Sequence, residues 1–264
     1  MAPVTALLYR MNHTPLWQRS IRVWGSSLRS TSLDRLLALS LHRLGLMGAA
    51  ERRLLEQRVR PGMRIVDIGA NIGIYSLLLA RLAGARGRVF AFEPEPNLFQ
   101  ALQANCQRNS TTNVTPLNFA LGDSAGSTAF YRSPFNTGDN RLGGLGWMGL
   151  RLDVEMIRLD DALPAAGVDF IKMDVQGYEM AVFRGMEGVF RASPQLEVFF
   201  EFWPSGLRAA GTDPDALLEH LFQRGFRVFA TDGDDLRPVM GLASLETQLK
   251  GRRYTNLLAT PNAT

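Results

Sequence analysis

Residues 64–73 constrain the fold of this chain more than any other segment. A short β-branched run, Arg64-Ile65-Val66, leads into Asp67-Ile68-Gly69-Ala70-Asn71-Ile72-Gly73, and apolar residues then recur at helical spacing from Ile74. Strand, glycine-rich turn and helix form a cradle for a nucleotide-type ligand at the carboxyl end of a strand. Glycine lets the backbone approach the ligand, and the helix N-terminus offers unpaired N–H groups.

A second apolar run, Val89-Phe90-Ala91-Phe92, ends in Glu93. A carboxylate at this point of the fold accepts hydrogen bonds from the hydroxyls of a ribose. The turn reads D-x-G-x-x-x-G, not the G-x-G-x-x-G of pyrophosphate binders, and its acid would repel a phosphate. These features favour S-adenosylmethionine (SAM), whose amino group suits Asp67, over NAD or FAD. The alternative is a turn whose glycines serve packing only.

Composition places the chain among ordinary globular proteins. Its 264 residues are 46% hydrophobic and 20% charged, enough for one sizeable α/β domain. The single cysteine, Cys106, cannot form an intramolecular disulfide, falls on the apolar face of an expected helix, and fits a cytoplasmic location. No apolar run of about 18 residues occurs, so no membrane span is expected, and the N-terminus does not read as a secretory signal.

We expect a helical, arginine-rich extension over residues 1–60 and one domain over residues 61–264. Ser32 is the expected cap of a first helix, and a second helix is expected over 49–59. The basic extension is either a solvated helical face or a surface for RNA, anionic lipid or an acidic substrate. Its helices also offer a surface for oligomerisation.

From Met63 onward strands and helices alternate, which predicts a parallel sheet with helices on both faces. Helices are expected to begin at Pro96 and Pro214. The glycine-rich segment 136–149, with a lone Trp147, is predicted to be a mobile lid. Further strands are expected over 114–119, 127–131, 151–159, 169–174, 196–202, 226–230 and 254–260.

Several short motifs occur in a fixed order across residues 63–202, with weaker similarity to about residue 260. They are the turn at 66–73, Phe92-Glu93-Pro94, Asn118-Phe119-Ala120-Leu121, Leu159-Asp160-Asp161, the run 169–177, and Glu179. As a group they resemble the FkbM family of SAM-dependent methyltransferases. Gln176 stands where the family more often has glutamate, so a catalytic role for that carboxylate is not carried over.

The resemblance implies the class I methyltransferase fold. This is a Rossmann-like α/β sheet of seven strands, order 3-2-1-4-5-7-6, with the last strand antiparallel and helices on both faces. It also implies methyl transfer from SAM to a hydroxyl, often on a sugar or a secondary metabolite. The residues expected to bind the cofactor are Asp67, Gly69, Ala70, Asn71, Gly73, Glu93, Pro94, Asn118, Phe119, Ala120 and Asp174.

The adenine is expected between apolar side chains beyond the second and third core strands. Pro94 and Phe119 are the predicted walls. Asn118 or Asp123 is in a position to reach the exocyclic amine, although Asp123 also suits a turn.

Methyl transfer to an alcohol needs in-line positioning and a general base. His13, His42 and His220 all lie away from the predicted strand ends. Carboxylates are therefore the remaining candidates for the base.

Asp174 and Glu201 each end a core strand, and Glu179 lies one turn into the helix after Asp174. We predict these three residues to be catalytic, with Asp174 as the acceptor-side carboxylate. The alternatives are a helix cap for Asp174, a buried acid paired with arginine for Glu201, and a structural ion-pair partner for Glu179. Asp174 and Glu201 also suit a divalent cation, but no third ligand is evident.

Three other functions stay open. A SAM-dependent RNA methyltransferase would use the basic extension, but no D/N-P-P-Y/F motif occurs and Cys106 does not follow a proline. A non-catalytic SAM-binding module would not need the carboxylates near the acceptor. An NAD-dependent oxidoreductase would need the glycine spacing G-x-G-x-x-G, which this chain does not have at the turn. A small-molecule or saccharide hydroxyl is the predicted acceptor, in preference to nucleic acid.

Overall fold

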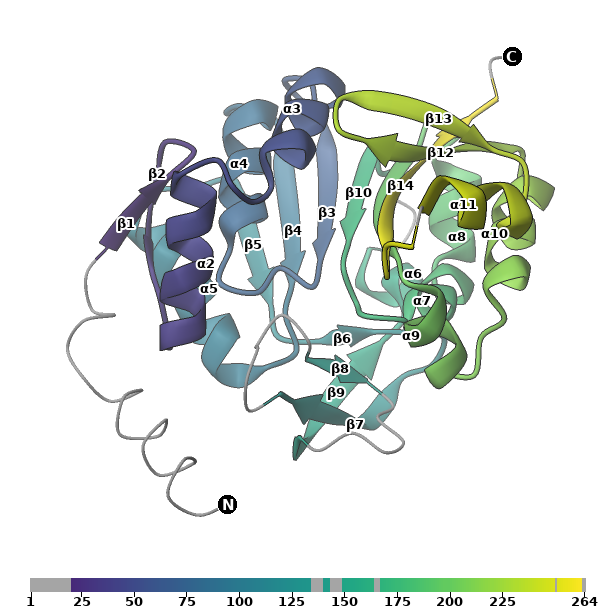
Figure 1. Ribbon diagram of the computed structural model, residues 1–264. Coiled ribbons are helices and arrows are strands. Elements are labelled where there is room, and N and C mark those ends of the chain that lie inside the picture. The colour runs from purple at the N-terminus through teal and green to yellow at the C-terminus, as the bar shows by residue number, and fades with distance from the viewer. Residues whose placement is uncertain (1–19, 134–139, 143–148, 164–166, 250, 263–264) are drawn as a thin grey trace.

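The computed structural model describes residues 20–133, 140–142, 149–163, 167–249 and 251–262. Within these residues eight strands form the main sheet, in the order β13-β12-β14-β11-β10-β3-β4-β5 (Figure 1). Their bounds are β3 Arg64–Ile68, β4 Arg88–Phe92, β5 Val114–Leu117, β10 Phe170–Met173, β11 Glu197–Phe202, β12 Phe226–Asp232, β13 Asp235–Val239 and β14 Thr255–Pro261.

The strands β5, β4, β3, β10 and β11 run parallel, and β14 is antiparallel to both β11 and β12. With β13 set aside, this is the order that the resemblance implies. The expected number of seven strands is wrong, because β12 turns back at Gly233 and β13 pairs with it along the edge of the sheet. Pro238 lies within β13, as an edge strand allows.

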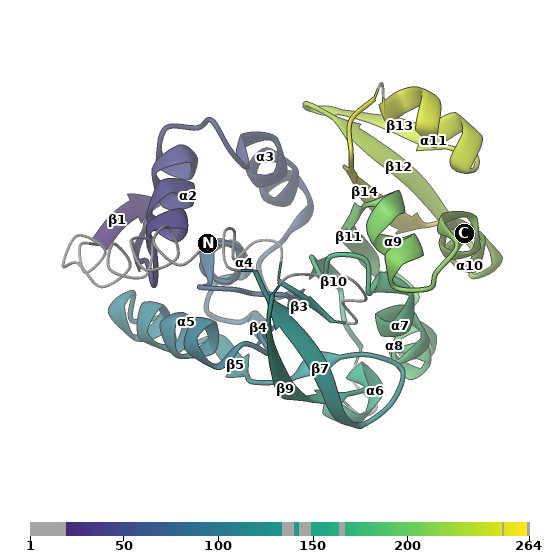
Figure 2. The same cartoon turned by 60° about the horizontal axis from the view of Figure 1, so that its bottom comes forward.

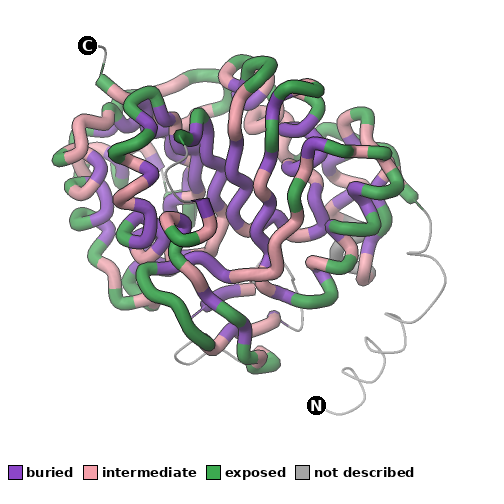
Figure 3. Tube along the Cα trace, turned by 180° about the vertical axis from the view of Figure 1, so that it is seen from behind, coloured by how far each residue is buried: buried purple, intermediate pink, exposed green. Residues whose placement is uncertain are grey.

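Alternate residues of each core strand pack on opposite faces of the sheet. Ile65 lies in one apolar cluster with Leu55 and Leu78, from α3 and α4, and Val66 lies in another with Val182, from α7. Figure 3 shows the buried residues concentrated in the central strands. The helices of the two faces are α3 Ala49–Arg58, α4 Ile74–Ala83, α5 Pro96–Arg108, α6 Leu159–Ala162, α7 Glu179–Arg184, α8 Glu187–Ala192, α9 Pro204–Ala209, α10 Pro214–Gln223 and α11 Leu242–Leu249.

A second, smaller sheet lies beyond the carboxyl ends of β3 and β4, and Figure 2 shows β7 and β9 of this sheet in front of those strands. Its strand order is β6-β9-β7-β8. The expected strand over 114–119 is divided, because β5 ends at Leu117 and the chain then enters β6. Most of the expected lid, with Trp147, lies outside the described residues. The bounds are β6 Ala120–Leu121, β7 Gly126–Arg132, β8 Arg141–Leu142 and β9 Leu150–Ile157.

The N-terminal extension is not wholly helical, which corrects the prediction. Residues 20–29 form a hairpin of β1 Ser20–Val23 and β2 Ser26–Arg29, and α2 Leu33–Arg43 follows. The Arg29 N–H donates to Asn105 Oδ1 of α5 at 2.8 Å, and Leu28 is fully buried. The hairpin is therefore part of the packed structure. Residues 1–19, with His13, lie outside the described residues.

Candidate active site

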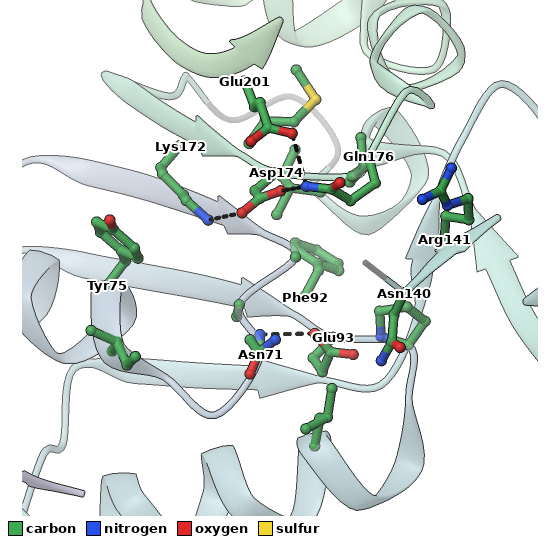
Figure 4. A pocket seen from close by; sticks show the side chains of 18 of the residues that line it. Asn71, Tyr75, Phe92, Glu93, Asn140, Arg141, Lys172, Asp174, Gln176 and Glu201 are labelled. Carbon is green, nitrogen blue, oxygen red and sulfur yellow. Dashed lines mark hydrogen bonds and ion pairs between the residues drawn. The ribbon is translucent and has the colours of Figure 1, made fainter. Parts of the chain in front are cut away.

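A cavity of about 450 Å³ lies at the carboxyl ends of β3, β4, β10 and β11 (Figure 4). Its volume is in the range of small-molecule and cofactor sites. The lining residues form two walls. The strand-end wall comprises Gly69, Ala70, Asn71, Glu93, Asp174, Gln176 and Glu201, and the outer wall comprises His42, Glu51, Arg141, Trp203, Arg253 and Tyr254.

The glycine-rich turn is fixed to the neighbouring strands. The N–H groups of Gly69 and Ala70 both donate to the Phe92 carbonyl, at 3.0 and 2.9 Å. Gly69 has a φ of +75°, and a Cβ there would lie 2.0 Å from the Asp174 carbonyl oxygen. Only glycine fits, because the ends of β3 and β10 approach each other at this point.

Glu93 lines the cavity with its carboxylate already anchored. Its Oε2 accepts the Asn71 N–H at 2.8 Å, its Oε1 accepts the Glu95 N–H at 2.9 Å, and the residue is 4% exposed. A carboxylate oxygen has a second lone pair, so the group can also accept a ligand hydroxyl. Pro94, Phe119 and Ala120, which the sequence predicts to bind the cofactor, also line the cavity.

Asn118 acts from behind the cavity. Its amide donates to the carbonyls of Glu93 and Pro94, at 2.8 and 3.1 Å, and so holds the loop after β4 in place. Neither Asn118 nor the exposed Asp123 is among the lining residues. The predicted contact of either side chain with an adenine amine does not match this placement.

Asp67 is fully buried and does not line the cavity. Its Oδ2 accepts the Ser76 hydroxyl at 2.6 Å, and the Lys172 Nζ lies 3.7 Å from its Oδ1. Burial raises the pKa of Asp67 although Lys172 acts in the opposite direction. The predicted contact of Asp67 with the cofactor amine does not match this placement. Gly73 is likewise set back from the cavity, as the N-cap of α4.

Lys172 is the cation that sequence reasoning missed on this wall of the cavity. It lies within the buried strand β10, 3.8 Å from Asp174 Oδ2 and 4.9 Å from the centre of the Tyr75 ring. It therefore lies between the buried Asp67 and the partly exposed Asp174. A lone charge within the apolar run Phe170–Met173 was the available signal.

Gln176 joins the two predicted acceptor-side acids. Its Nε2 donates to Asp174 Oδ1 and to Glu201 Oε1, each at 2.8 Å, as Figure 4 shows. Burial, together with the negative charges of Asp174 and Glu179, raises the pKa of Glu201 to about 8. A carboxyl group that titrates near neutral pH is suited to proton transfer. The structure thus brings Asp174 and Glu201 together.

Glu179 is not on the cavity wall. It is 1% exposed, and its Oε1 accepts the Gly177 N–H at 3.1 Å. Burial raises the pKa of Glu179 to about 7. Its placement indicates that it shapes the Gln176–Gly177 turn, and the predicted direct catalytic contact does not match.

The outer wall contains a histidine that the sequence placed away from the site. Helix α2 brings His42 to the cavity, where its ring packs edge-on against Trp24, with centroids 4.9 Å apart. Burial lowers the pKa of His42. On the same wall, the side-chain amide of Asn256 donates to Glu51 Oε1 at 3.0 Å. This hydrogen bond joins the first turn of α3 to the beginning of β14.

The described residues contain no group of three or more His, Cys, Asp and Glu side chains arranged to hold a metal ion. In the same part of the chain, no helix has the length and apolar character needed to cross a membrane.

The Methyltransferase FkbM domain matches residues 67–228 of the chain. The chain belongs to the FkbM methyltransferase family. The matched region begins at Asp67 and contains both ends of the strand-end wall, from Gly69 to Glu201.

Three relatives show how far this similarity extends. Methyltransferase sdnD of Sordaria araneosa is 32% identical over 201 residues, 62% of this chain and 73% of the relative. Hexuronic acid methyltransferase AglP of Haloferax volcanii is 32% identical over 138 residues, 51% of this chain and 54% of AglP. The 31-O-demethyl-FK506 methyltransferase FkbM of Streptomyces tacrolimicus is 29% identical over 161 residues, 49% of this chain and 61% of that enzyme.

Proposed function

We propose that this protein is a SAM-dependent O-methyltransferase that acts on a hydroxyl of a sugar or another small molecule. The observation that carries the proposal is the Glu93 carboxylate, buried and anchored at the end of β4, beside the turn at Gly69 and within the cavity. The family membership supports methyl transfer, and two relatives are named for small-molecule acceptors, a hexuronic acid and 31-O-demethyl-FK506.

The strand-end wall fits SAM. Glu93 offers oxygen acceptors for ribose hydroxyls, and Phe92, Pro94 and Phe119 offer apolar surface for a base. Asp174 supplies negative charge on the same wall, which suits a cationic ligand. SAM would supply an activated methyl group bound to a sulfonium.

The remaining task of the protein is to position the acceptor and to take its proton. Glu201 is the group best suited to the second role, because its pKa of about 8 lets it exchange a proton near neutral pH. Gln176 holds the Glu201 carboxyl, and Asp174 on the other side of Gln176 adds the negative charge that raises its pKa. This arrangement favours Glu201 as the base, with Asp174 and Gln176 as positioning residues.

The direct test is calorimetric titration of the full chain with SAM and, separately, with NAD. We expect saturable binding of SAM alone. Transfer of a labelled methyl group from SAM to a panel of sugars and hydroxylated metabolites then tests the reaction. Binding of NAD in preference to SAM would refute the cofactor assignment, and methyl transfer to a nitrogen or carbon acceptor would refute O-methylation.

A further inference from the structure

Two arginines lie against one tryptophan on the outer wall. The guanidinium carbon of Arg141 is 4.7 Å from the centre of the Trp203 ring, and that of Arg253 is 5.8 Å from it. Arg141 comes from β8 and Arg253 from the segment before β14, so two distant parts of the chain meet at one ring. An aromatic face positions a guanidinium group while its N–H donors point outward in the plane of the group.

Trp203 itself is fixed by close packing. A Cβ at Gly206 would lie 2.3 Å from Trp203 Cε3, so the ring packs directly on the backbone of α9. A Cβ at Gly177 would lie 2.4 Å from the Gly206 carbonyl carbon. The ring is therefore held in a constant position relative to the Gln176–Gly177 turn. Because Gln176 also holds Glu201, the arginines have a defined position relative to the proposed base.

Acidic side chains predominate on the strand-end wall and arginines on the outer wall, although Lys172 lies beside Asp174 on the first and Glu51 lies on the second. The strand-end wall carries Glu93, Asp174 and Glu201, of which Asp174 is the one assigned above to a positive group of SAM. The outer wall carries Arg141 and Arg253, and Arg141 is only 8% exposed. The two guanidinium groups that contact this ring place two positive charges on the same wall, and guanidinium groups bind carboxylates and phosphates through charge-assisted hydrogen bonds.

We propose that Arg141 and Arg253 form a subsite for an oxyanion group, a carboxylate or a phosphate, carried by the methyl acceptor. The acceptor would then be an acidic molecule whose hydroxyl group reaches Glu201 while its anionic group meets the arginines. The identification of the ligand as the acceptor rests on the proposed function. Trp203 follows Glu201 by two residues at the end of β11, which places the subsite beside the base.

The test uses the full chain, the variant Arg253→Gln and the matched control Arg252→Gln. Arg252 is the exposed neighbour of Arg253, is paired with Asp232, and does not line the cavity. Sodium acetate and inorganic phosphate are the probes, titrated at constant ionic strength against chloride. We expect saturable binding of at least one of them to wild type and to Arg252→Gln, weakened at least tenfold in Arg253→Gln. The anion that binds more tightly identifies the group.

Three results would overturn the proposal. The first is no binding of acetate or phosphate to wild type beyond that of chloride. The second is equal weakening in Arg252→Gln, which would show only diffuse attraction by surface charge. The third is a tenfold loss of SAM affinity in Arg253→Gln with unchanged affinity for 5′-methylthioadenosine. Since 5′-methylthioadenosine lacks the amino acid part of SAM, this result would show that Arg253 holds the cofactor carboxylate. Failure of wild type to bind SAM would refute the proposed function instead, since the anion titrations need no SAM.

Discussion

The two walls of the cavity hold their polar groups in different ways. In the strand-end wall the turn N–H groups and the Glu93 carboxylate are bonded to neighbouring backbone or to each other. In the outer wall the side chains come from α2, α3, β8, the residue that follows β11 and the segment before β14, and Tyr254 is 52% exposed. The comparison indicates that the strand-end wall is preorganised for its ligand. The shape of the outer wall instead depends on how distant segments of the chain pack together.

The largest effect on activity is expected at Glu201, where the two walls meet. Glu201→Gln should lower kcat by about 10²–10⁴-fold, because the variant cannot take a proton from the acceptor, while SAM affinity stays the same. Single-turnover methyl transfer on an identified acceptor measures this. The matched control is Glu179→Gln, a second buried acid with a raised pKa that does not line the cavity. Equal losses in both variants would contradict the role of Glu201 as base.

The glycine-rich turn should be the part of the strand-end wall that is least tolerant of substitution. Gly69→Ala places a Cβ against the Asp174 carbonyl at a positive φ, and should lower the free energy of unfolding by about 2–5 kcal/mol. Urea unfolding measures this. Gly84→Ala is the control, because Gly84 has a φ of +64° but nothing within 4 Å of an added Cβ, and backbone strain alone should cost about 1–3 kcal/mol. Equal costs would show that the approach of β10 is not the constraint.

Substitutions at Glu93 and Asp67 compare the effect on SAM affinity of a carboxylate that lines the cavity with that of one that lies behind it. Glu93→Gln should weaken SAM binding by about 1.5–3 kcal/mol, because the variant loses charged hydrogen bonds. Asp67→Asn keeps the shape of a side chain that does not reach the cavity, and should change the SAM Kd by less than about threefold, or 1 kcal/mol. Isothermal titration calorimetry compares the two. A larger loss in Asp67→Asn would show that the buried ion pair with Lys172 sets the cavity shape.

The pH dependence of turnover tests how the acids of the strand-end wall influence one another. If Glu201 acts as the base, kcat should rise with pH through about 8, because the group must be deprotonated to accept a proton. Asp174 is one of the charges that raise this pKa, so Asp174→Asn should move the midpoint to lower pH. A pH–rate profile of both proteins measures the shift. An unmoved midpoint would mean that another group titrates.

The smallest effect is expected in the outer wall at His42. His42→Phe keeps an aromatic ring against Trp24 and should leave the SAM Kd within about threefold of wild type. Titration calorimetry with SAM is the measurement. A tenfold loss would mean that α2 contributes directly to cofactor binding, and the division between the walls would have to be redrawn.

Sequence reasoning succeeded where structure is determined locally. The strands ending before Gly69, Glu93, Asp174 and Glu201 were predicted because each is a buried apolar run followed by polar or glycine residues. Parallel strands bring their carboxyl ends to one edge of a sheet, so these residues were expected to converge. The cavity confirms that convergence for these four positions.

Sequence reasoning was less successful where contacts join distant segments. His42 and Arg253 reach the cavity only because α2 and the segment before β14 fold over the strand ends, and no local pattern encodes that packing. The hairpin at residues 20–29 had a local signal, since Ile21 and Val23 alternate before Trp24-Gly25. The positive φ angles of Trp24 and Gly25, 49° and 89°, show the tight turn that this signal produces.

The contact between Gly177 and Gly206 has a consequence for how such a protein can diversify. Any side chain at Gly177 meets the backbone at Gly206, and any side chain at Gly206 meets the Trp203 ring. Both positions must therefore remain glycine, whereas Arg253 is exposed and its replacement should not disturb the fold. New acceptor preferences would then arise by successive replacements around a tryptophan that stays in place.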